Sequence, residues 1–467
     1  MISYDVAVIG AGPGGYVAAI KAAQAGKKVV CIDIKSTPGG TCLNVGCIPS
    51  KALLCSSHKY YEALHEMANH GIDLGSVSIS LKKMMERKDR VVADLAKGIM
   101  SLFGKNGIQF IEGRVSFIDS HTLRITSGSG VESSIIASNI IIATGSESIS
   151  LPGVVVDEER IVSSTGALSL QSVPAKLAII GAGVIGLEMG SIWSRLGSEV
   201  IVVEYANQIL PAFDKDISKE AKKILSDQGL SFTLNAKVQK AEVRDDKVVL
   251  SYEQAGESHV IECDILLSAI GRRPYTNGLN LEGIKVGVEL NKIGQIVVNA
   301  NFKTSIPHIY AIGDVIAGPM LAHKASEEGF AVAEIICSHV PIINYNNIPN
   351  VIYTHPEIAT VGKSEIQLQQ ENIDYKVSKF PLTANSRSRA NGETSGLVKI
   401  ITDKKSDKII GAAIVGSGAG ELIQEIVIAM EFVASSEDLA RICFGHPSIG
   451  EAIKEAALGA FDKPIHI

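Results

Sequence analysis

The chain has 467 residues, of which 46% are hydrophobic and 20% are charged, and its formal net charge is −6. This length exceeds what one hydrophobic core supports, so we expect several domains. The composition is that of a soluble, globular protein. Acidic and basic residues are interspersed and no apolar run reaches about 20 residues, which argues against a nucleic-acid partner, a polybasic membrane anchor and a membrane span.

The cysteines and the first residues bear on the compartment. The number of cysteines, 7, is odd, and no basic leader precedes the apolar stretch at residues 6–20, as it would in a signal peptide. These features predict a cytoplasmic protein, in which a disulfide would serve catalysis rather than structure. Five cysteines are interpreted as ordinary buried or half-buried thiols: Cys31, Cys55, Cys263, Cys337 and Cys443.

The chain opens with a strand, a glycine-rich turn, a helix, a second strand and an acid, in the order of a βαβ dinucleotide site. Gly10 permits the tight turn, Gly12 lets the backbone approach a pyrophosphate at the helix N-terminus, and Gly15 allows helix and strand to come close. The predicted parts are a strand at 5–9, a helix at 16–25, a strand at 28–32, and Asp33.

Two cysteines, Cys42 and Cys47, follow within residues 39–51. Four intervening residues, with Gly46 next to the second cysteine, favour a small redox-active disulfide loop. A zinc site would need two further ligands nearby, and the 7 Cys and 11 His show none of the usual ligand spacings. Inert core thiols are the other alternative, but glycine and polar neighbours do not build an apolar core position. We therefore predict a two-electron relay beside a redox cofactor, and no metal.

The dinucleotide pattern returns at Gly181, Gly183 and Gly186, and Glu204 follows at the spacing that separates Asp33 from its own first glycine. A carboxylate here accepts hydrogen bonds from the adenosine ribose and repels a 2′-phosphate, so Glu204 predicts NAD rather than NADP. Because the cysteine pair follows the first pattern directly, we place a flavin in the first site and the nicotinamide in the second.

Three further strands precede glycine turns, at 140–145, 265–271 and 309–313. We expect the first two to close the two nucleotide-binding units. Asp314 follows the third, at the carboxyl end of a strand, where ligands lie in open α/β sheets. A helix cap is the alternative role for this acid.

From about residue 349 the pattern changes to strands at 397–402 and 408–415 and an amphipathic helix at 421–433. This composition predicts an antiparallel sheet with helices, a separate domain suited to self-association. His446, followed by Pro447, and Glu451 could form an acid/base pair, because a carboxylate can orient an imidazole. A histidine before proline can also simply end a helix.

Together these motifs resemble the pyridine-nucleotide disulfide oxidoreductase family, most closely its branch that oxidises dihydrolipoyl groups. The resemblance covers essentially the whole chain: residues 39–51, both glycine patterns, 190–197, 269–274, 313–314, 318–323, 353–357 and 446–451. It implies an α/β fold with two Rossmann-like dinucleotide-binding domains and a C-terminal α+β dimerisation domain. The implied boundaries are 1–147 for FAD binding, 148–270 for NAD binding, 271–347 for a central domain completing the FAD site, and 348–467 for the interface domain.

The resemblance also implies residue roles. Cys42 is implied to meet substrate, Cys47 to lie against the flavin, His446 to be the acid/base and Glu451 its orienter, with Lys51 and Glu188 pairing near the flavin and nicotinamide. Asp314 is implied to bind the ribityl chain of FAD. The implied FAD set is Gly10, Gly12, Gly15, Asp33, Gly40, Thr41, Lys51, Gly113, Thr144, Gly145, Asp314, Met320, Leu321, Ala322 and His323. The implied NAD set is Gly181, Gly183, Gly186, Glu188, Glu204, Val238, Ala269 and Gly271.

The implied activity is FAD-dependent oxidation of protein-bound dihydrolipoyl groups to lipoyl disulfide, with reduction of NAD to NADH. The implied assembly is a homodimer in which His446 of one subunit reaches the cysteine pair of the other. Implied partners are the lipoyl-bearing acyltransferase core of a 2-oxo-acid dehydrogenase complex or a lipoyl carrier protein of glycine cleavage. Glutathione reductases are disfavoured because they generally use NADPH, with basic residues where Glu204 stands. Mercuric reductases are disfavoured because they end in extra cysteines, which residues 461–467 do not contain. A non-catalytic scaffold subunit would need neither the thiols nor the His–Glu pair.

Overall fold

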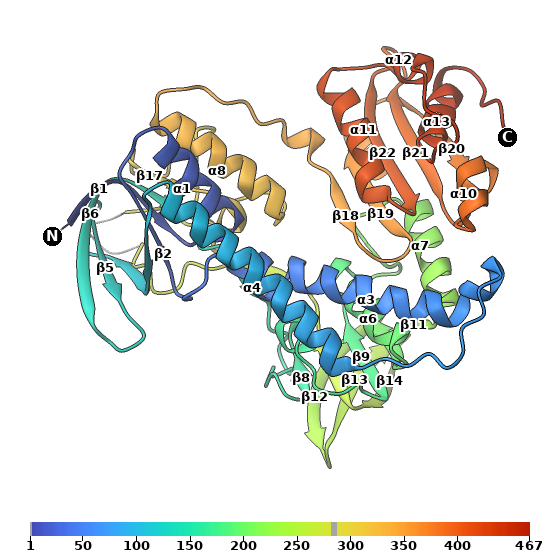
Figure 1. Ribbon diagram of the computed structural model, residues 1–467, viewed down its shortest axis with the longest axis horizontal. Helices are drawn as coiled ribbons and strands as arrows, with labels where there is room; N and C mark the ends of the chain where they lie inside the picture. The colour runs from blue at the N-terminus through green and yellow to red at the C-terminus, as the bar shows by residue number, and fades with distance from the viewer. Residues whose placement is uncertain (1, 282–286) are drawn as a thin grey trace. The chain divides into compact units, whose positions relative to one another are not determined.

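The computed structural model describes residues 2–281 and 287–467. The chain forms two compact units, each of which combines segments that are distant in the sequence (Figure 1). The first contains Met1–Leu53, Ser80–Ser150 and Ile270–Ile343, and the second contains Leu54–Ile79, Leu151–Ala269 and Asn344–Ile467. Neither unit coincides with one predicted domain, so the four domain boundaries stay a prediction. Within the described ranges, none of the helices combines the length and apolar character needed to cross a bilayer.

A largely parallel sheet forms the centre of the first unit. Its parallel part has the order β3-β2-β1-β6-β17, and the long strand β6 also pairs in antiparallel fashion with β5, which pairs with β4. The bounds are β1 Ile2–Ile9, β2 Val29–Asp33, β3 Gln109–Glu112, β4 Arg114–Phe117, β5 Thr122–Thr126, β6 Glu132–Ile142 and β17 Ile309–Ala311. A separate two-stranded ribbon pairs β7 (Ser146–Ser148) with β16 (Arg272–Pro274).

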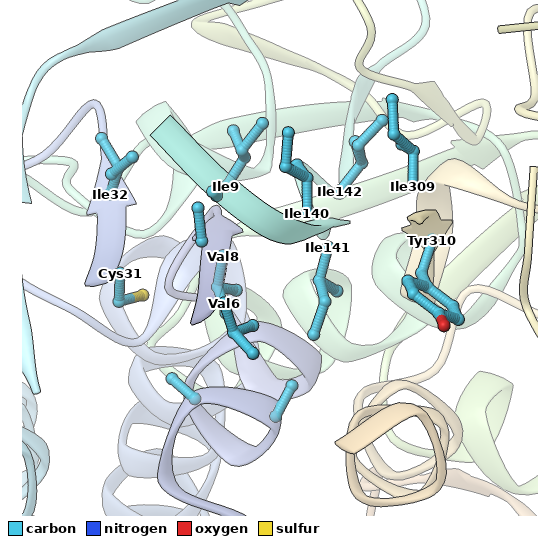
Figure 2. Packing of buried hydrophobic residues seen from close by; sticks show 14 of the residues in the cluster. Val6, Val8, Ile9, Cys31, Ile32, Ile140, Ile141, Ile142, Ile309 and Tyr310 are labelled. Atoms are coloured by element: carbon cyan, nitrogen blue, oxygen red, sulfur yellow. The ribbon is translucent and has the colours of Figure 1, made fainter. Parts of the chain in front are cut away.

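The strands of this sheet read as continuous apolar runs because both faces are buried. In register across four strands, Cys31, Val8, Ile141 and Tyr310 form one row. Figure 2 shows Cys31, Ile141 and Tyr310 on one face and Ile32, Ile9, Ile142 and Ile309 on the other. The alternation of side chains thus fills two apolar layers, and the parallel strands end together at one edge of the sheet.

Helices α1 and α8 lie side by side in the first unit (Figure 1). Small residues allow the contact: a Cβ at Gly14 would lie 2.8 Å from the Ala325 carbonyl oxygen, and one at Gly329 would lie 2.3 Å from the Gly14 carbonyl oxygen. The backbones therefore touch directly, which fixes the two helices against each other. The helices of this unit are α1 Pro13–Gln24, α2 Gly40–Val45, α4 Leu81–Lys105 and α8 Ala322–Ile336, with the 3-10 turn η2 Gly313–Val315. Helix α3 (Cys47–His65) continues into the second unit.

The second unit repeats the nucleotide-binding architecture and adds antiparallel sheets. A parallel sheet has the order β11-β10-β9-β15-β8, and a three-stranded antiparallel sheet has the order β12-β13-β14. The strands are β8 Ile161–Val162, β9 Lys176–Ile180, β10 Glu199–Val203, β11 Leu230–Thr233, β12 Ala236–Arg244, β13 Lys247–Gln254, β14 Glu257–Cys263 and β15 Ile265–Ser268. The helices are α5 Ser164–Ala167, α6 Val184–Arg195 and α7 Lys215–Asp227.

The C-terminal third of the chain forms an antiparallel sheet of order β18-β19-β22-β21-β20. Its strands are β18 Asn350–Ile352, β19 Glu357–Gly362, β20 Tyr375–Pro381, β21 Leu397–Asp403 and β22 Ile409–Gly416. Its helices are α9 Glu365–Gln370, α10 Ser386–Asn391, α11 Ala419–Glu431, α12 Ser436–Arg441 and α13 Glu451–Phe461. Helices α11 and α13 share one apolar core with the sheet. The predicted fold class, α/β with a C-terminal α+β part, is confirmed.

Candidate active site

The two glycine-rich turns have nearly identical backbones. Gly10 has φ +102° and Gly181 has φ +101°, a conformation that favours glycine. A Cβ at Gly15 would lie 1.8 Å from the Gly10 carbonyl oxygen, and a Cβ at Gly186 would lie 2.0 Å from that of Gly181. The helix therefore follows the turn at a distance that only glycine permits, as the pattern predicted.

The start of each of these helices fits a phosphate group. Gly12 and Gly183 are the N-cap residues of α1 and α6, and in the part of the chain that the structure describes no side chain caps either helix. A Cβ at Gly183 would meet no atom within 4 Å. Open space beside unpaired N–H groups and the positive end of the helix dipole is what a pyrophosphate requires. The residues present thus fit one dinucleotide at each turn.

Asp33 and Glu204 are held in the same way at the ends of β2 and β10. Asp33 accepts from Ala11 N at 2.7 Å and Lys35 N at 3.0 Å, one bond to each carboxylate oxygen. The oxygens of Glu204 accept from Ala182 N and Ala206 N, both at 2.7 Å. Each oxygen keeps a further lone pair for a ribose hydroxyl.

The cysteine pair lies where α2 ends and α3 begins. Gly46 separates the two helices, and a Cβ there would lie 2.9 Å from the Thr41 carbonyl oxygen and 3.4 Å from the Cys42 Cα. Glycine therefore lets α2 turn back onto α3. Cys42 and Cys47 are half-buried and carry reduced thiols. The hydrogen bond to Cys47, and then burial, raise the pKa of the Cys42 thiol, against the opposing charge of Lys51. Cys42 therefore holds its proton, so Cys47 is the group better placed to carry negative charge.

Asp314 is fixed by contacts that sequence reasoning missed. Ser146 Oγ donates to Asp314 Oδ2 at 2.6 Å, and Arg272 binds Ser146 through its hydroxyl at 2.8 Å and its carbonyl at 2.7 Å. Burial lowers the pKa of Arg272, while the charges of Asp314 and Cys47 oppose that shift. Arg272 stands in the motif at residues 269–274, but nothing in that motif signals a partner 126 residues away.

All residues of the predicted FAD set lie in the first unit. The Gly113 N–H, between β3 and β4, donates to the Asp33 carbonyl at 2.8 Å, so these two members are adjacent. Thr144 donates through Oγ1 to the Tyr275 carbonyl at 2.6 Å, and Leu321 is the N-cap of α8. Gly40 and Thr41 lie on α2.

The predicted NAD set lies in the second unit except for Gly271, which belongs to the first. Val238 lies on β12, and the Ala269 N–H donates to the Ile180 carbonyl at 2.9 Å. Glu188 is 3% exposed and accepts from Tyr353 N at 3.0 Å. Lys51 belongs to the other unit, so its pairing with Glu188 stays a prediction.

His446 and Glu451 are brought together in the loop before α13. The His446 Nδ1 and Glu451 Oε1 are 2.9 Å apart, and the other carboxylate oxygen accepts from Ser448 N at 2.8 Å. Although burial acts to raise it, the hydrogen bonds from Ser448 and His446 lower the pKa of Glu451. The Asn385 side chain donates to the Ser448 carbonyl at 3.0 Å and so anchors the loop to a distant segment of the chain. The geometry is that of an oriented imidazole whose second nitrogen is open to a substrate.

Two of the five remaining cysteines differ from expectation. Cys31 and Cys263 are buried and Cys337 is half-buried, but Cys55 and Cys443 are exposed. Cys55 lies on the exposed side of α3 and Cys443 in the loop after α12, where no apolar periodicity constrains a thiol. The prediction that both are buried or half-buried was wrong.

Two family models cover most of the chain. Residues 4–329 match the model described as pyridine nucleotide-disulphide oxidoreductase, and residues 348–457 match the dimerisation domain of the same family. Domains of this family bind FAD and a pyridine nucleotide, so the predicted cofactors, FAD and NAD, are confirmed.

Curated relatives resemble the chain over nearly its full length. The mitochondrial dihydrolipoyl dehydrogenase of Pisum sativum is 52% identical, covering 99% of this chain and 92% of that protein. The mitochondrial enzyme of Cricetulus griseus is also 52% identical, covering 100% and 92%. Among solved structures, LpdA from Mycobacterium tuberculosis has a TM-score of 0.89 at 28% identity, covering 98% of this chain and 99% of that one.

The predicted cytoplasmic location is contradicted by these relatives, which are named as mitochondrial and point to a mitochondrial location instead. Cysteine usage indicates a reducing environment, but it does not distinguish one reducing compartment from another.

The reduced cysteine pair and the two nucleotide turns agree with the full-length matches. The chain belongs to the pyridine nucleotide-disulphide oxidoreductase family.

Proposed function

We propose that this chain oxidises protein-bound dihydrolipoyl groups to lipoyl disulfide and reduces NAD to NADH. The observation that carries the proposal is the hydrogen-bonded Cys42–Cys47 pair, which lies in the same unit as the first nucleotide turn. Relatives that are 52% identical are named dihydrolipoyl dehydrogenases, and this similarity supports the same substrate class. A scaffold subunit would need neither this pair nor the oriented His446.

The residues of the chain supply the thiol chemistry. His446 takes the proton of one dihydrolipoyl thiol, and the resulting thiolate attacks Cys42 Sγ of the oxidised pair. The Cys42–Cys47 bond breaks, and Cys47 leaves as the thiolate. The second substrate thiol then attacks the mixed disulfide at the substrate sulfur. This step releases the cyclic lipoyl disulfide, and the proton of the second thiol passes to the leaving Cys42 thiolate.

Electrostatics in the site favour this order of events. The raised pKa of the Cys42 thiol favours protonation of this leaving sulfur over protonation of Cys47. Glu451 remains ionised because its pKa is lowered, and it can stabilise the imidazolium that His446 becomes. FAD and NAD, when bound, supply the two-electron carriers that take up the reducing equivalents. The residues of the predicted FAD set would hold the first cofactor, and those of the predicted NAD set would hold the second.

The proposed assembly is a homodimer with composite sites. The dimerisation domain at residues 348–457 supports it, because this segment carries His446 and Glu451 while the cysteine pair lies in the other unit. We further propose that the dimer docks on a lipoyl-bearing acyltransferase core or uses a lipoyl carrier protein. These partners present the same lipoyl arm to the site.

The test of the relay is Cys47→Ser. We expect the variant to keep FAD, seen in its visible absorbance, and to lose at least about a thousandfold in dihydrolipoamide-dependent NADH formation, because a hydroxyl cannot form the disulfide. Cys55→Ser is the matched control, since Cys55 is an exposed thiol on the same helix. Turnover of the Cys47→Ser variant at the rate of the Cys55→Ser variant would contradict the relay.

A further inference from the structure

Helix α8 contains two opposite charges that are withdrawn from solvent. Lys324 is 1% exposed and Glu328 is 0% exposed, and Lys324 Nζ lies 3.1 Å from Glu328 Oε1. Removing charges from water is costly, and apolar residues of similar volume often give an equally stable protein. Stability alone therefore does not explain this pair.

Both ions bind the same peptide unit. Glu328 Oε2 accepts from the Gly313 N–H at 2.7 Å, and Lys324 Nζ donates to the Gly313 carbonyl at 3.1 Å. Gly313 is buried, has φ +77° and is the first residue of η2, just after β17. The ion pair thus fixes both polar groups of a residue whose conformation few other residues adopt.

The residue held in this way directly precedes Asp314. The side chain of Asp314 is fixed separately, through Ser146 and Arg272. Lys324 also approaches Gly318, in the segment before α8: a Cβ there would lie 3.1 Å from Lys324 Cε. The pair therefore contacts the Gly313 peptide beside Asp314, and Lys324 also approaches Gly318, two residues before the predicted FAD residues 320–323.

Attachment of α8 does not depend on the ion pair. The backbone contacts of Gly14 with Ala325 and of Gly329 with Gly14 already hold α8 against α1. Neighbouring Glu327, on the same helix, is exposed. The specific contact of the buried pair is the turn that carries Asp314.

We propose that Lys324 and Glu328 are positioning residues that hold the Gly313 peptide so that Asp314 presents its carboxylate to the ribityl chain of FAD. This inference rests on the proposed function, because it assumes that FAD occupies the first unit. It assigns the pair a role in cofactor affinity rather than in the thiol chemistry.

The test measures FAD binding by titrating flavin-free, full-length protein with FAD. It compares the wild type with the double variant Lys324→Met/Glu328→Leu. The apolar pair removes both charges together, so neither is left buried alone. We expect the dissociation constant of the variant for FAD to rise at least about tenfold, because the Gly313 N–H and carbonyl lose their partners. Hydrogen exchange of the peptide containing Gly313 should be faster in the flavin-free variant.

Two further variants make the result specific. Glu327→Gln changes the same helix at an exposed site and should bind FAD as the wild type does. Glu328→Gln keeps an acceptor for the Gly313 N–H and should bind FAD with an affinity between those of the wild type and the double variant. If the double variant is unstable, Glu328→Gln provides the comparison: affinity equal to that of the wild type, with unchanged exchange at Gly313, overturns the proposal.

The outcomes separate this inference from the proposed function. Wild-type affinity for FAD in both the double variant and Glu328→Gln overturns the inference and leaves the proposed function in place. Wild-type protein that takes up no FAD overturns both. Weaker FAD binding in the double variant, with wild-type binding by Glu327→Gln, supports the positioning role.

Discussion

Glu204 is the single side chain that we predict selects the pyridine nucleotide of the second unit. Its two oxygens are held by Ala182 N and Ala206 N, so the carboxylate cannot swing away from a ligand at the end of β10. A fixed negative charge favours ribose hydroxyls and opposes a 2′-phosphate.

We therefore predict at least about a hundredfold higher kcat/KM with NAD than with NADP in the wild type, and a smaller ratio in Glu204→Gln, which lacks the charge. Initial rates with both nucleotides measure the ratio. Glu199→Gln, which removes an exposed acid at the other end of the same strand, should leave it unchanged. An equal or faster wild-type rate with NADP would remove the assignment.

At the scale of elements, one buried ammonium joins three parts of the second unit. Lys399 of β21 is 0% exposed and lies 2.8 Å from Asp214, 3.0 Å from Asp216 and 2.5 Å from Glu365. These acids belong to the start of α7 and to α9. The three carboxylates lie close enough together to hold a cation, and the Lys399 ammonium supplies one. Burial lowers the pKa of Lys399, but its hydrogen bonds to the acids outweigh that effect and raise it.

Lys399→Met should lower the free energy of unfolding by about 3–5 kcal/mol, because it leaves three acids without their buried partner. Lys379→Met is the control: Lys379 is 43% exposed and pairs with Asp216, so its loss should cost about 0–1 kcal/mol. Urea unfolding of both variants at neutral pH gives the comparison. Equal losses would show that the buried network contributes no more than a surface pair.

At the scale of the whole molecule, two half-buried histidines link stability to pH. His58 of α3 and His355 stack with ring centroids 3.7 Å apart. Burial, then the neighbouring His58 and Arg195, lower the pKa of His355 to about 3. Burial and Arg195 also lower the pKa of His58. The folded chain therefore keeps both rings neutral at pH values where the unfolded chain protonates them.

Because the unfolded state binds more protons, the free energy of unfolding should fall as the pH falls below the ordinary histidine pKa of about 6.5. His355→Asn removes one of these groups and should flatten the loss between pH 7 and pH 5, which urea unfolding at several pH values would measure. His70→Asn changes an exposed histidine and should follow the wild type. Parallel curves for wild type and His355→Asn would contradict the assignment.

The composite site of the proposed homodimer predicts complementation between two inactive chains. Cys47→Ser and His446→Gln should each be inactive, but a mixed dimer has one site made of the two intact halves. Co-expression of differently tagged chains should therefore give mixed dimers with about half the wild-type activity. Mixed dimers as inactive as the parents would place both groups of a site in one chain.

The local sequence determined the features that depend on short spacing. The glycine turns, the acids that follow them and the Cys42–Cys47 loop are each encoded within one strand–turn–helix segment, where neighbouring residues fix the backbone. The antiparallel strands near residues 397–416 and the His446–Glu451 pair are local in the same sense. The composition alone also indicated several domains without a membrane span.

Only the tertiary structure decided which distant residues meet. Asp314 meets Ser146, 168 residues away, because the parallel strands β6 and β17 end at one edge of the sheet. Arg272 reaches Ser146 because β16 pairs with β7 in the antiparallel ribbon. No local pattern distinguishes Lys324 and Glu328 from ordinary surface charges of a helix. Their shared partner, the Gly313 peptide, is identified only in the folded chain. Likewise, exposure of Cys55 and Cys443 follows from which side of their elements the rest of the chain covers. Burial and long-range hydrogen bonds are properties of the packed chain, and no local pattern encodes them.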